Sequence, residues 1–244
     1  MEKVINFEDA MNIAEEIDQK QSRKGLRGRV NVYDDLGNLI LQKDNLIVMR
    51  GRTFALEKLF NSPIDAEESG YKVNMNRTIS LFKIGSGGAD LASTPFQPFT
   101  PVYSDEDLSQ PVPFVVQDPK KNEDPEKENN PSIVEALSEE QSKKYYIPNV
   151  KEDGTTEFYG KVFESQPQWV FNKETNEVYK KITLKVNIDE ARGFYINELG
   201  LVIAEYDEEN NTFDDSELFS RITFDSESLT SLTKTLLFEY LIFA

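Results

Sequence analysis

The 244-residue chain contains no cysteine and no histidine. Without cysteine it can form neither disulfides nor thiol nucleophiles, and without either residue it lacks the usual zinc ligands. Histidine is also the side chain that most often moves protons near neutral pH. Any chemistry would depend on carboxylates, lysines or metals bound through oxygen. We therefore predict a protein that is not an enzyme and that has no cofactor or metal site.

Long apolar runs and an excess of basic charge are also missing. No apolar run approaches the roughly 20 residues that a transmembrane helix requires, and the first nine residues lack a basic region followed by an apolar core. We expect no membrane association, no signal peptide and synthesis in the cytoplasm. The net charge is −17, which repels phosphate backbones, so we expect no direct nucleic-acid binding. The acidic surface serves solubility or docks on a basic partner.

The N-terminal 29 residues combine an amphipathic pattern with a basic stretch. Apolar side chains recur at helical spacing over residues 6–20, which predicts a helix. Residues 20–29 are basic in an otherwise acidic chain, and they are either a docking arm for an acidic neighbour or a solvated linker. The candidate contact residues of this stretch are Arg23, Lys24, Arg27 and Arg29.

Residues 30–94 predict the first part of a β domain. Residues 30–48 are typical of a hairpin, residues 53–61 of a short helix, and residues 76–84 of a strand. The strand runs into a glycine-rich loop, residues 85–88. A phosphate-binding loop needs Lys followed by Ser or Thr after its last glycine, but here Ala89 and Asp90 follow. The glycines instead indicate a bend where backbones approach closely.

Residues 95–157 differ in composition. Prolines are frequent, and residues 118–131 include no apolar side chain. Such a segment cannot bury enough surface to offset its chain entropy. We predict an extended insertion that is mobile or becomes ordered against a partner.

Residues 158–244 predict packed antiparallel strands. One strand is expected over 158–171, a polar turn over 172–177, and its partner over 178–189, where apolar and polar side chains alternate. Residues 196–204 are continuously apolar and should form a central strand. Strands over 218–224 and 233–243 complete the pattern. Phe238, Tyr240 and Phe243 lie in the last strand, which we expect to be buried in a sheet or against another subunit.

Few residues in this region suggest chemistry. Glu190 or Glu198 could act with Asp189 in glycoside hydrolysis, which uses paired carboxylates. Glu198 stands out because it lies among apolar neighbours. The preferred interpretation is an ion pair with Arg192 or Arg221, or hydrogen bonding to a turn at Gly200. Trp169 could stack on a sugar, although a lone Trp on a strand is more often a core or interface residue. The acidic loop over 206–215 lacks the glycine and the spacing of an EF-hand, which favours a solvated hairpin loop.

Several short motifs together resemble the β-module of tailed-bacteriophage tail, baseplate and fibre-attachment proteins. They are an N-E-apolar-G-L strand at 196–202, an R-apolar-T-F segment at 218–224, a closing strand at 238–243, a segment at 45–56, and an I-G-x-G strand end at 84–88. The resemblance covers roughly residues 30–89 and 179–243, in the same order. It implies a non-enzymatic structural subunit of the virion, in the tail or baseplate, that docks to other virion proteins as a homo- or hetero-oligomer. The alternatives are a head or neck subunit, such as a collar or decoration protein, and a carbohydrate-binding or cell-wall-degrading tail component.

The predicted fold is α+β and mainly β. It is an antiparallel sandwich or distorted barrel with an N-terminal helix and a long insertion rich in proline and acidic residues. The predicted divisions are 1–29, 30–94, 95–157 and 158–244, the second and fourth forming one β domain. The candidate interface residues are Arg23, Lys24, Arg27, Arg29, Trp169, Phe238, Tyr240 and Phe243.

Overall fold

A computed structural model describes residues 26–62, 75–115, 145–154, 156–187, 190–191, 195–210, 212–225 and 235–243. It is mainly β, with 54% strand and one helix in the described part, and most strands form one large antiparallel sheet. The mainly-β, α+β prediction is confirmed. The sheet does not close into a barrel, so the sandwich is the better description. The predicted helix at 6–20 and the charged stretch at 118–131 lie outside the described residues.

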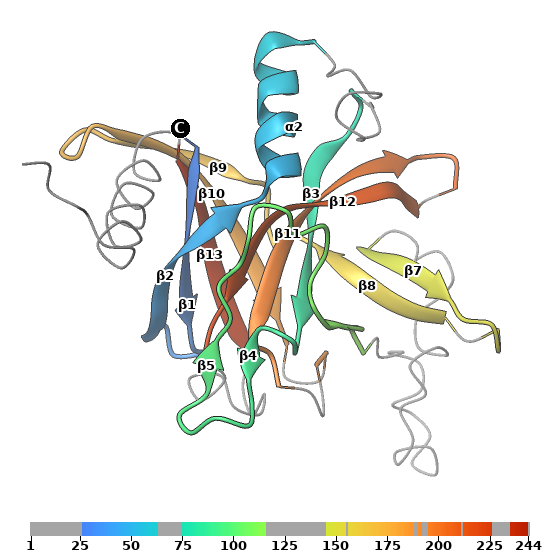
Figure 1. The fold of residues 1–244 in the computed structure, drawn as a ribbon. Coiled ribbons are helices and arrows are strands. Elements are labelled where there is room, and N and C mark those ends of the chain that lie inside the picture. The colour runs from blue at the N-terminus through green and yellow to red at the C-terminus, as the bar shows by residue number, and fades with distance from the viewer. Residues whose placement is uncertain are drawn as a thin grey trace, which may run out of the picture.

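The elements follow one another along the chain in a simple order (Figure 1). They are β1 (Arg27–Tyr33), β2 (Leu39–Ile47), α2 (Met49–Phe60), β3 (Thr78–Gly85), β4 (Ala89–Asp90), β5 (Gln97–Pro98), β6 (Pro111–Val112), β7 (Tyr146–Val150), β8 (Thr156–Val162), β9 (Gln168–Asn172), β10 (Glu177–Val186), β11 (Glu198–Asp207), β12 (Thr212–Thr223) and β13 (Leu236–Phe243).

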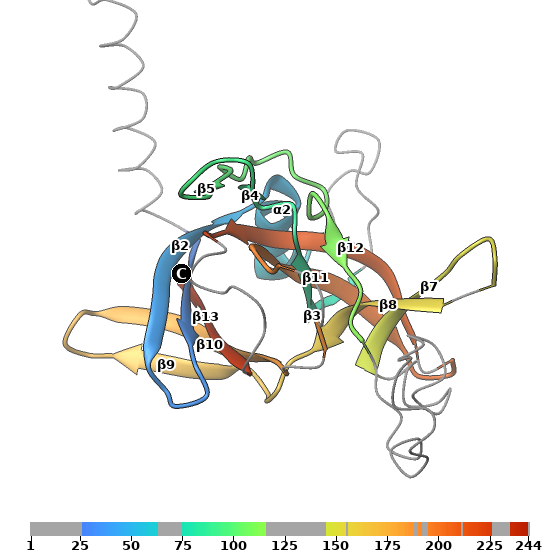
Figure 2. The ribbon, with the colours of Figure 1, turned by 90° about the horizontal axis from the view of Figure 1, so that it is seen from below.

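The large sheet runs in the order β7-β8-β3-β11-β12-β2-β1-β13-β10-β9, with β6 paired to β3, while β4 and β5 form a small separate ribbon. β2 joins the two halves of this sheet. Most of β2 pairs with β1, whereas Leu46 and Ile47 pair with β12. Figure 2 shows that the sheet curves strongly at β2, so that its two halves enclose a common interior. The two ends, β7 and β9, lie on opposite sides of the molecule.

The main core fills the space between these halves. Val32 and Phe238 from one half belong to the same buried cluster as Phe82, Leu199 and Leu201 from the other. β11 is buried on both faces, because Val202 and Ala204 pack in a second cluster on the opposite face. This double burial explains why the sequence of β11 is continuously apolar and not alternating. The predicted central strand is therefore confirmed.

The hairpins predicted from alternation are also present. In β10, Ile182, Leu184 and Val186 are buried, while Lys181 and Lys185 on the other face are only partly buried. Successive side chains of a strand point to opposite faces, so this pattern places one face of β10 on the core. β1 and β2 form the predicted first hairpin. Their turn is closed by Asp34, whose Oδ1 accepts hydrogen bonds from two backbone N–H groups.

Several predicted boundaries differ from the structure, and among them β12 begins at Thr212, six residues before the predicted start of its strand. The short helix begins at Met49, four residues before the predicted start. The strand expected over 158–171 is two strands: β8 pairs with β3 and β7, and β9 pairs with β10 at the far end of the sheet. Residues 95–115, which we assigned to an extended insertion, pack on the sheet and bury Leu108, Val112 and Phe114. These three isolated anchors have no periodicity that the sequence could reveal.

The one helix of the described residues does not have the length and apolarity needed to cross a bilayer.

Candidate functional site

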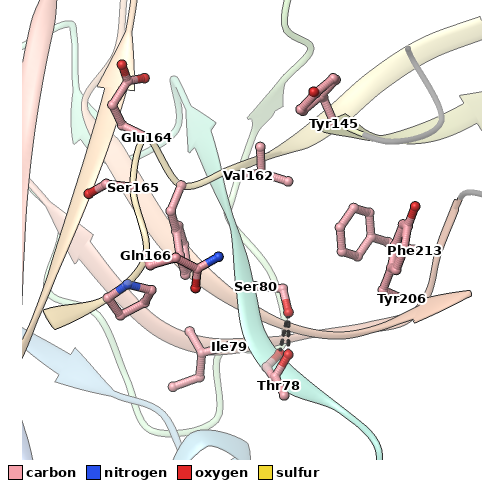
Figure 3. Close-up of a pocket in the computed structure, with 12 residues that line it drawn as sticks. Thr78, Ile79, Ser80, Tyr145, Val162, Glu164, Ser165, Gln166, Tyr206 and Phe213 are labelled. Carbon is pink, nitrogen blue, oxygen red and sulfur yellow. Dashed lines mark hydrogen bonds between the residues drawn. The ribbon is translucent and has the colours of Figure 1, made fainter. Parts of the chain in front are cut away.

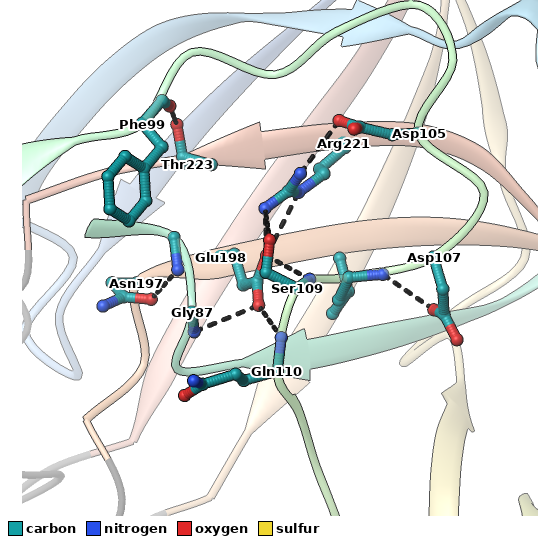
Figure 4. A network of polar contacts seen from close by, with 12 residues as sticks. Gly87, Phe99, Asp105, Asp107, Ser109, Gln110, Asn197, Glu198, Arg221 and Thr223 are labelled. Atoms are coloured by element: carbon teal, nitrogen blue, oxygen red, sulfur yellow. Dashed lines mark hydrogen bonds and ion pairs between the residues drawn. The ribbon is translucent and has the colours of Figure 1, made fainter. Parts of the chain in front are cut away.

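A buried network of polar groups surrounds Glu198, at the start of β11 (Figure 4). The side chain is fully buried. Its Oε1 accepts hydrogen bonds from the backbone N–H groups of Gly87 and Gln110, at 3.1 and 2.9 Å. Its Oε2 accepts one from the backbone N–H of Ser109, at 3.1 Å. One carboxylate thus binds both the glycine-rich loop and the segment that leads into β6.

Arg221 of β12 completes this arrangement. Its Nη2 and Nε donate to Glu198 Oε2 at 2.7 and 3.1 Å, and its Nη1 donates to Asp105 Oδ2 at 2.9 Å. Nη2 also donates to Ser109 Oγ at 2.6 Å. Burial opposes the charge of Arg221, but the hydrogen bonds with Asp105 and Glu198 outweigh it and raise the pKa of the guanidinium above its ordinary value. We call Glu198, Arg221, Asp105, Ser109 and the 85–88 loop the Glu198 cluster.

The glycine-rich loop is an intrinsic part of the cluster. The backbone N–H of Gly88 donates to Asn197 Oδ1 at 2.6 Å. A Cβ atom at Gly88 would lie 2.2 Å from the backbone oxygen of Asn197, and one at Gly85 would lie 2.5 Å from Glu198 Oε1. The glycines are therefore required by the close approach of the loop to β11, as the sequence indicated. The loop's N–H groups bind protein oxygen atoms where a nucleotide-binding loop would bind phosphate.

This geometry favours a structural role for Glu198. A carboxylate that is closed to solvent and accepts from three N–H groups and a guanidinium has no oxygen directed at a substrate. The predicted ion pair with Arg221 is present, while Arg192, the other candidate, lies outside the described residues. Asp105, Ser109 and Gln110 were missed, because they come from the stretch predicted to be an insertion. Within the sequence, no spacing or periodicity connects them to Glu198.

A second buried cluster of charges fixes α2 to the sheet. Arg50 Nε donates to Glu217 Oε2 at 2.6 Å, and Arg50 Nη1 donates to Glu57 Oε2 at 3.0 Å. Arg77, which directly precedes β3, also pairs with Glu217. Gly51 lets the helix approach β12 closely, since a Cβ there would lie 2.0 Å from the backbone oxygen of Phe219. The side of α2 that faces the sheet is thus partly ionic.

The opposite side of α2 is apolar and exposed. Leu59 is 74% exposed and Phe60 is 70% exposed. Leu56 is 56% exposed and Met49 is 50% exposed. Leu56, Leu59 and Phe60 are three and four residues apart, so they form one surface on the helix. In Figure 1, α2 stands away from the sheet at the top of the view. A projecting helix that buries charges and presents apolar side chains is typical of an interaction surface. We call Leu56, Leu59 and Phe60 the α2 surface.

An open groove lies between the start of β3, the segment after β8 and the β11–β12 hairpin (Figure 3). It encloses about 660 Å³, and its wall includes Tyr206 and Phe213, whose ring centroids are 5.1 Å apart. Among the described residues that line it, Glu164 is the one carboxylate. Glycoside hydrolysis requires two carboxylates, so the lining residues do not supply that chemistry.

The structure uses most of the predicted interface residues internally. Phe238, Tyr240 and Phe243 lie in β13, and all three are buried in the core or under Arg27. Their apolar side chains, which suggested a seam with another subunit, are covered within the chain: Phe238 and Tyr240 belong to the main core, and Phe243 is 4% exposed. The backbone of β13 pairs with β1 on one side and β10 on the other. This assignment is corrected: these side chains are core residues.

The described arginines of the basic stretch are also engaged within the chain. Arg27 pairs with Glu177 at 2.6 Å, and its guanidinium lies 4.4 Å from the ring centroid of Phe243. Arg29 pairs with Asp44 at 3.1 Å. Each arginine therefore has an acidic partner in the fold. Arg23 and Lys24 lie outside the described residues, so their predicted role is unchanged.

Of the predicted interface residues that the structure describes, Trp169 is the one whose side chain is largely exposed. It lies on β9, at one end of the sheet, and is 61% exposed. Phe171, which the sequence analysis did not select, is 68% exposed beside it, with ring centroids 6.4 Å apart and an interplanar angle of 30°. Lys180 Nζ lies 4.7 Å from the centroid of the Trp169 ring. The two aromatic side chains form a second exposed apolar surface, on a different element from α2.

The acidic loop forms the end of the β11–β12 hairpin. Asp207 accepts hydrogen bonds from the backbone N–H groups of Glu209 and Asn210 and from the Asn210 amide. The hydrogen bonds with Asn210 lower the pKa of Asp207 below its ordinary value. This carboxylate closes the turn, in line with the predicted hairpin. In the described parts of the chain, no group of three or more acidic residues is arranged to hold a metal ion.

Comparison with protein-family models, with curated proteins and with solved structures finds no match to this chain.

Proposed function

We propose that this protein is a non-enzymatic structural subunit of a tailed-bacteriophage virion, in the tail or baseplate, which acts by docking to other virion proteins. The proposal begins from the resemblance of its short motifs to tail and baseplate proteins. It gains support from what those motifs do in the fold. A head or neck position is the alternative within the same class.

The motifs that carry the resemblance meet in one place. The N-E-apolar-G-L motif supplies Asn197 and Glu198, the R-apolar-T-F motif supplies Arg221, and the I-G-x-G motif supplies Gly85 and Gly87. Glu198 contacts Gly87 and Arg221 directly. Residues from three distant segments thus form one buried structural unit, which supports treating the three matches as parts of a single module.

The observation that carries the docking role is the α2 surface. The helix buries Arg50 and Glu57 with their ionic partners and exposes Leu56, Leu59 and Phe60. Exposed apolar surface of this kind is costly in water unless another protein covers it. A subunit that works within an assembly has such a cover, and its partner here would be another virion structural protein.

Quantitative mass spectrometry of purified particles tests this proposal. Tailed particles would be purified on a density gradient from the culture that encodes the chain, and washed at high salt. We expect the protein at a fixed ratio to the other structural proteins across the particle fractions. Recovery of the chain in the soluble fraction, with none in the particles, would overturn the proposal.

A carbohydrate-binding tail component is the second candidate. It is favoured by the exposed Trp169–Phe171 pair, since aromatic faces stack on sugars. Lys180 already occupies a position over the Trp169 ring, which leaves less of that ring for a ligand. Binding of the isolated protein to host cell-wall glycans, lost on Trp169→Ala, would favour this candidate over a purely structural subunit.

A further inference from the structure

The two ends of the large sheet differ in how they are protected. β7, at one end, has Pro148 at its centre and an irregular register with β8 between Tyr146 and Ile147. Proline has no N–H to donate, and both features are common devices that stop an edge strand from pairing further. β9, at the other end, contains no proline and no charged residue, although 29% of the chain is charged. Its register with β10 is uninterrupted over all five residues.

Within the described part of the chain, β9 pairs on one side, with β10. Its other edge therefore offers backbone N–H and C=O groups that a further strand could bind. The β9–β10 hairpin extends away from the body of the protein in both overall views (Figures 1 and 2).

The side chains of β9 are arranged in two simple rows. Trp169 and Phe171 lie on one face, and Gln168, Val170 and Asn172 lie on the other, because side chains alternate along a strand. The aromatic row lies on the face of the sheet that also carries the core. This follows from the register, in which Trp169 is opposite Lys180, and the buried Ile182 is two residues further along β10. The core face thus continues outward as exposed aromatic surface.

We propose that β9 pairs antiparallel with β9 of a second copy of this chain, about a two-fold axis at Val170. In that register Trp169 lies opposite Phe171 of the second copy, Gln168 opposite its Asn172, and Val170 opposite its Val170. Aromatic residues then face aromatic residues, amides face amides, and no charge requires a partner. A two-fold interface must be complementary to itself, and this five-residue sequence meets that condition along its whole length.

The distribution of charge also fits a second copy. Two chains of net charge −17 repel each other. Residues 168–181, which form the hairpin, contain three lysines and two glutamates, so their net charge is +1. The proposed contact is therefore made where the acidic charge of the protein is locally absent. This inference stands whether or not the chain is a virion component.

A single engineered cysteine tests the axis directly, because the natural chain has none. Residues opposite each other in an antiparallel pair have Cα atoms about 4.5–5.5 Å apart, a separation that a disulfide can bridge. The full-length Val170→Cys protein would be treated with a mild oxidant at micromolar concentration. We expect a disulfide-linked dimer of twice 28.0 kDa on a non-reducing gel, formed at least ten times faster than for the control.

The matched control is Val150→Cys on β7, where the side chain is 68% exposed. If both proteins cross-link at the same rate, or if Val170→Cys stays monomeric, the proposed pairing is wrong.

A charge exchange tests the same axis without cysteine. Val170→Lys and Val170→Glu each place like charges opposite each other at the axis, so each should lower the dimer fraction at least tenfold in sedimentation experiments. An equimolar mixture should restore the dimer, because an introduced ammonium then meets an introduced carboxylate. Melting curves of each variant confirm that the monomer is folded. A wild-type protein that is monomeric at 100 μM, or a mixture that stays monomeric, would overturn the inference.

Discussion

At the scale of single residues, Glu198 and Tyr240 show how buried polar groups connect distant segments of the fold, and Tyr240 also bridges the two halves of the sheet. Glu198 ties the glycine-rich loop and the 105–110 segment to Arg221 of β12. Tyr240 lies in the interior, where its hydroxyl contacts Ser220 of β12 and Asn45 of β2. Each side chain therefore connects segments that are far apart in sequence. Replacing either side chain should lower the free energy of unfolding. For Glu198 the loss comes from a buried charge without its partner, and for Tyr240 the loss depends on pH.

Glu198→Gln should destabilise the protein by about 3–5 kcal/mol, because removing one partner of a buried ion pair leaves the other charge incompletely compensated. The amide also replaces one acceptor oxygen with a donor that faces backbone N–H groups. Urea unfolding at pH 7 measures the change. The control is Glu164→Gln, whose carboxylate is about half exposed and 3.8 Å from Lys185; its effect should stay within about 0.5 kcal/mol. Equal effects of the two substitutions would contradict a structural role for the Glu198 cluster.

Tyr240 should make the protein less stable at high pH. Burial raises the pKa of its hydroxyl well above the ordinary value of 10.0, and burial with the nearby Glu157 raises the pKa of Tyr159 to about 12. A raised pKa means that the folded state keeps a proton that the unfolded state loses. The contribution to stability is therefore complete below pH 10 and decreases as the pH rises above 10, by about 1.4 kcal/mol per pH unit for each such group.

Tyr240→Phe provides the test of this pH dependence. At pH 7 the variant should lose about 1–3 kcal/mol, because Asn45 and Ser220 lose a buried hydrogen-bond partner. Between pH 10 and 11.5 the free energy of unfolding of the variant should fall less steeply than that of the wild type. The difference in slope should equal the contribution of one phenol, about 1.4 kcal/mol per pH unit. Denaturant midpoints at several pH values measure both. Parallel curves for the two proteins would show that Tyr240 does not carry the dependence.

At the scale of elements, α2 and β9 each present neighbouring apolar side chains that are largely exposed. α2 is held by the Arg50, Glu57 and Glu217 ion pairs and presents Leu59 and Phe60 outward. β9 presents Trp169 and Phe171. The surfaces lie on different elements, so a subunit could use one for a second copy and the other for a different protein. Substitutions can separate the two uses.

The double variant Leu59→Gln, Phe60→Gln should assemble poorly while folding normally. Both side chains are largely exposed, so the melting temperature of the isolated protein should change by no more than about 2 °C. Incorporation into particles that lack the native copy should fall at least tenfold, since the apolar contact is lost. Leu36→Gln is the matched control, because Leu36 is 83% exposed in the β1–β2 turn. Wild-type incorporation of the double variant would exclude the α2 surface from assembly.

Local sequence patterns foretold the elements whose burial follows a regular period. The alternation of Ile182, Leu184 and Val186 predicted β10, and the continuous apolar run predicted the central strand β11. Patterns failed where burial depends on distant partners. Leu108, Val112 and Phe114 are isolated anchors in a proline-rich stretch, and Arg50 is neutralised by Glu217, far along the chain. No local window contains both members of such a pair.

The candidate surfaces were predictable to a smaller extent. The Glu198–Arg221 pair was among the alternatives drawn from the sequence, since Glu198 stood among apolar neighbours. Phe238 and Tyr240 were assigned to an interface because a strongly apolar closing strand needs cover, but the core between the two halves of the sheet supplies that cover within the chain. The exposure of Leu59 and Phe60 could not be foreseen, because their helix pattern equally suits a core-facing helix. Only the buried charges opposite them decide which side faces the sheet.

At the scale of the whole molecule, most described strands form a single bent sheet. The edge strand at one end is protected against further pairing, and the edge strand at the other end is not. Pro148 lies in the strand at one end, while β9 at the other has an uncharged edge. The strongly acidic composition keeps copies apart except where the charge is locally balanced. This combination suits a subunit that joins an assembly in a fixed orientation, which is the property that a virion component requires.

Electron microscopy of tailed particles labelled with an antibody against this protein tests that central claim most directly. Label concentrated at the distal end of the tail is the result that the proposed function predicts, and label at the junction of head and tail would move the subunit to the neck. Labelling would be repeated with antibody that has been absorbed on the purified protein, as a control. Particles that carry no specific label, although the protein is made during infection, would contradict a structural role in the virion.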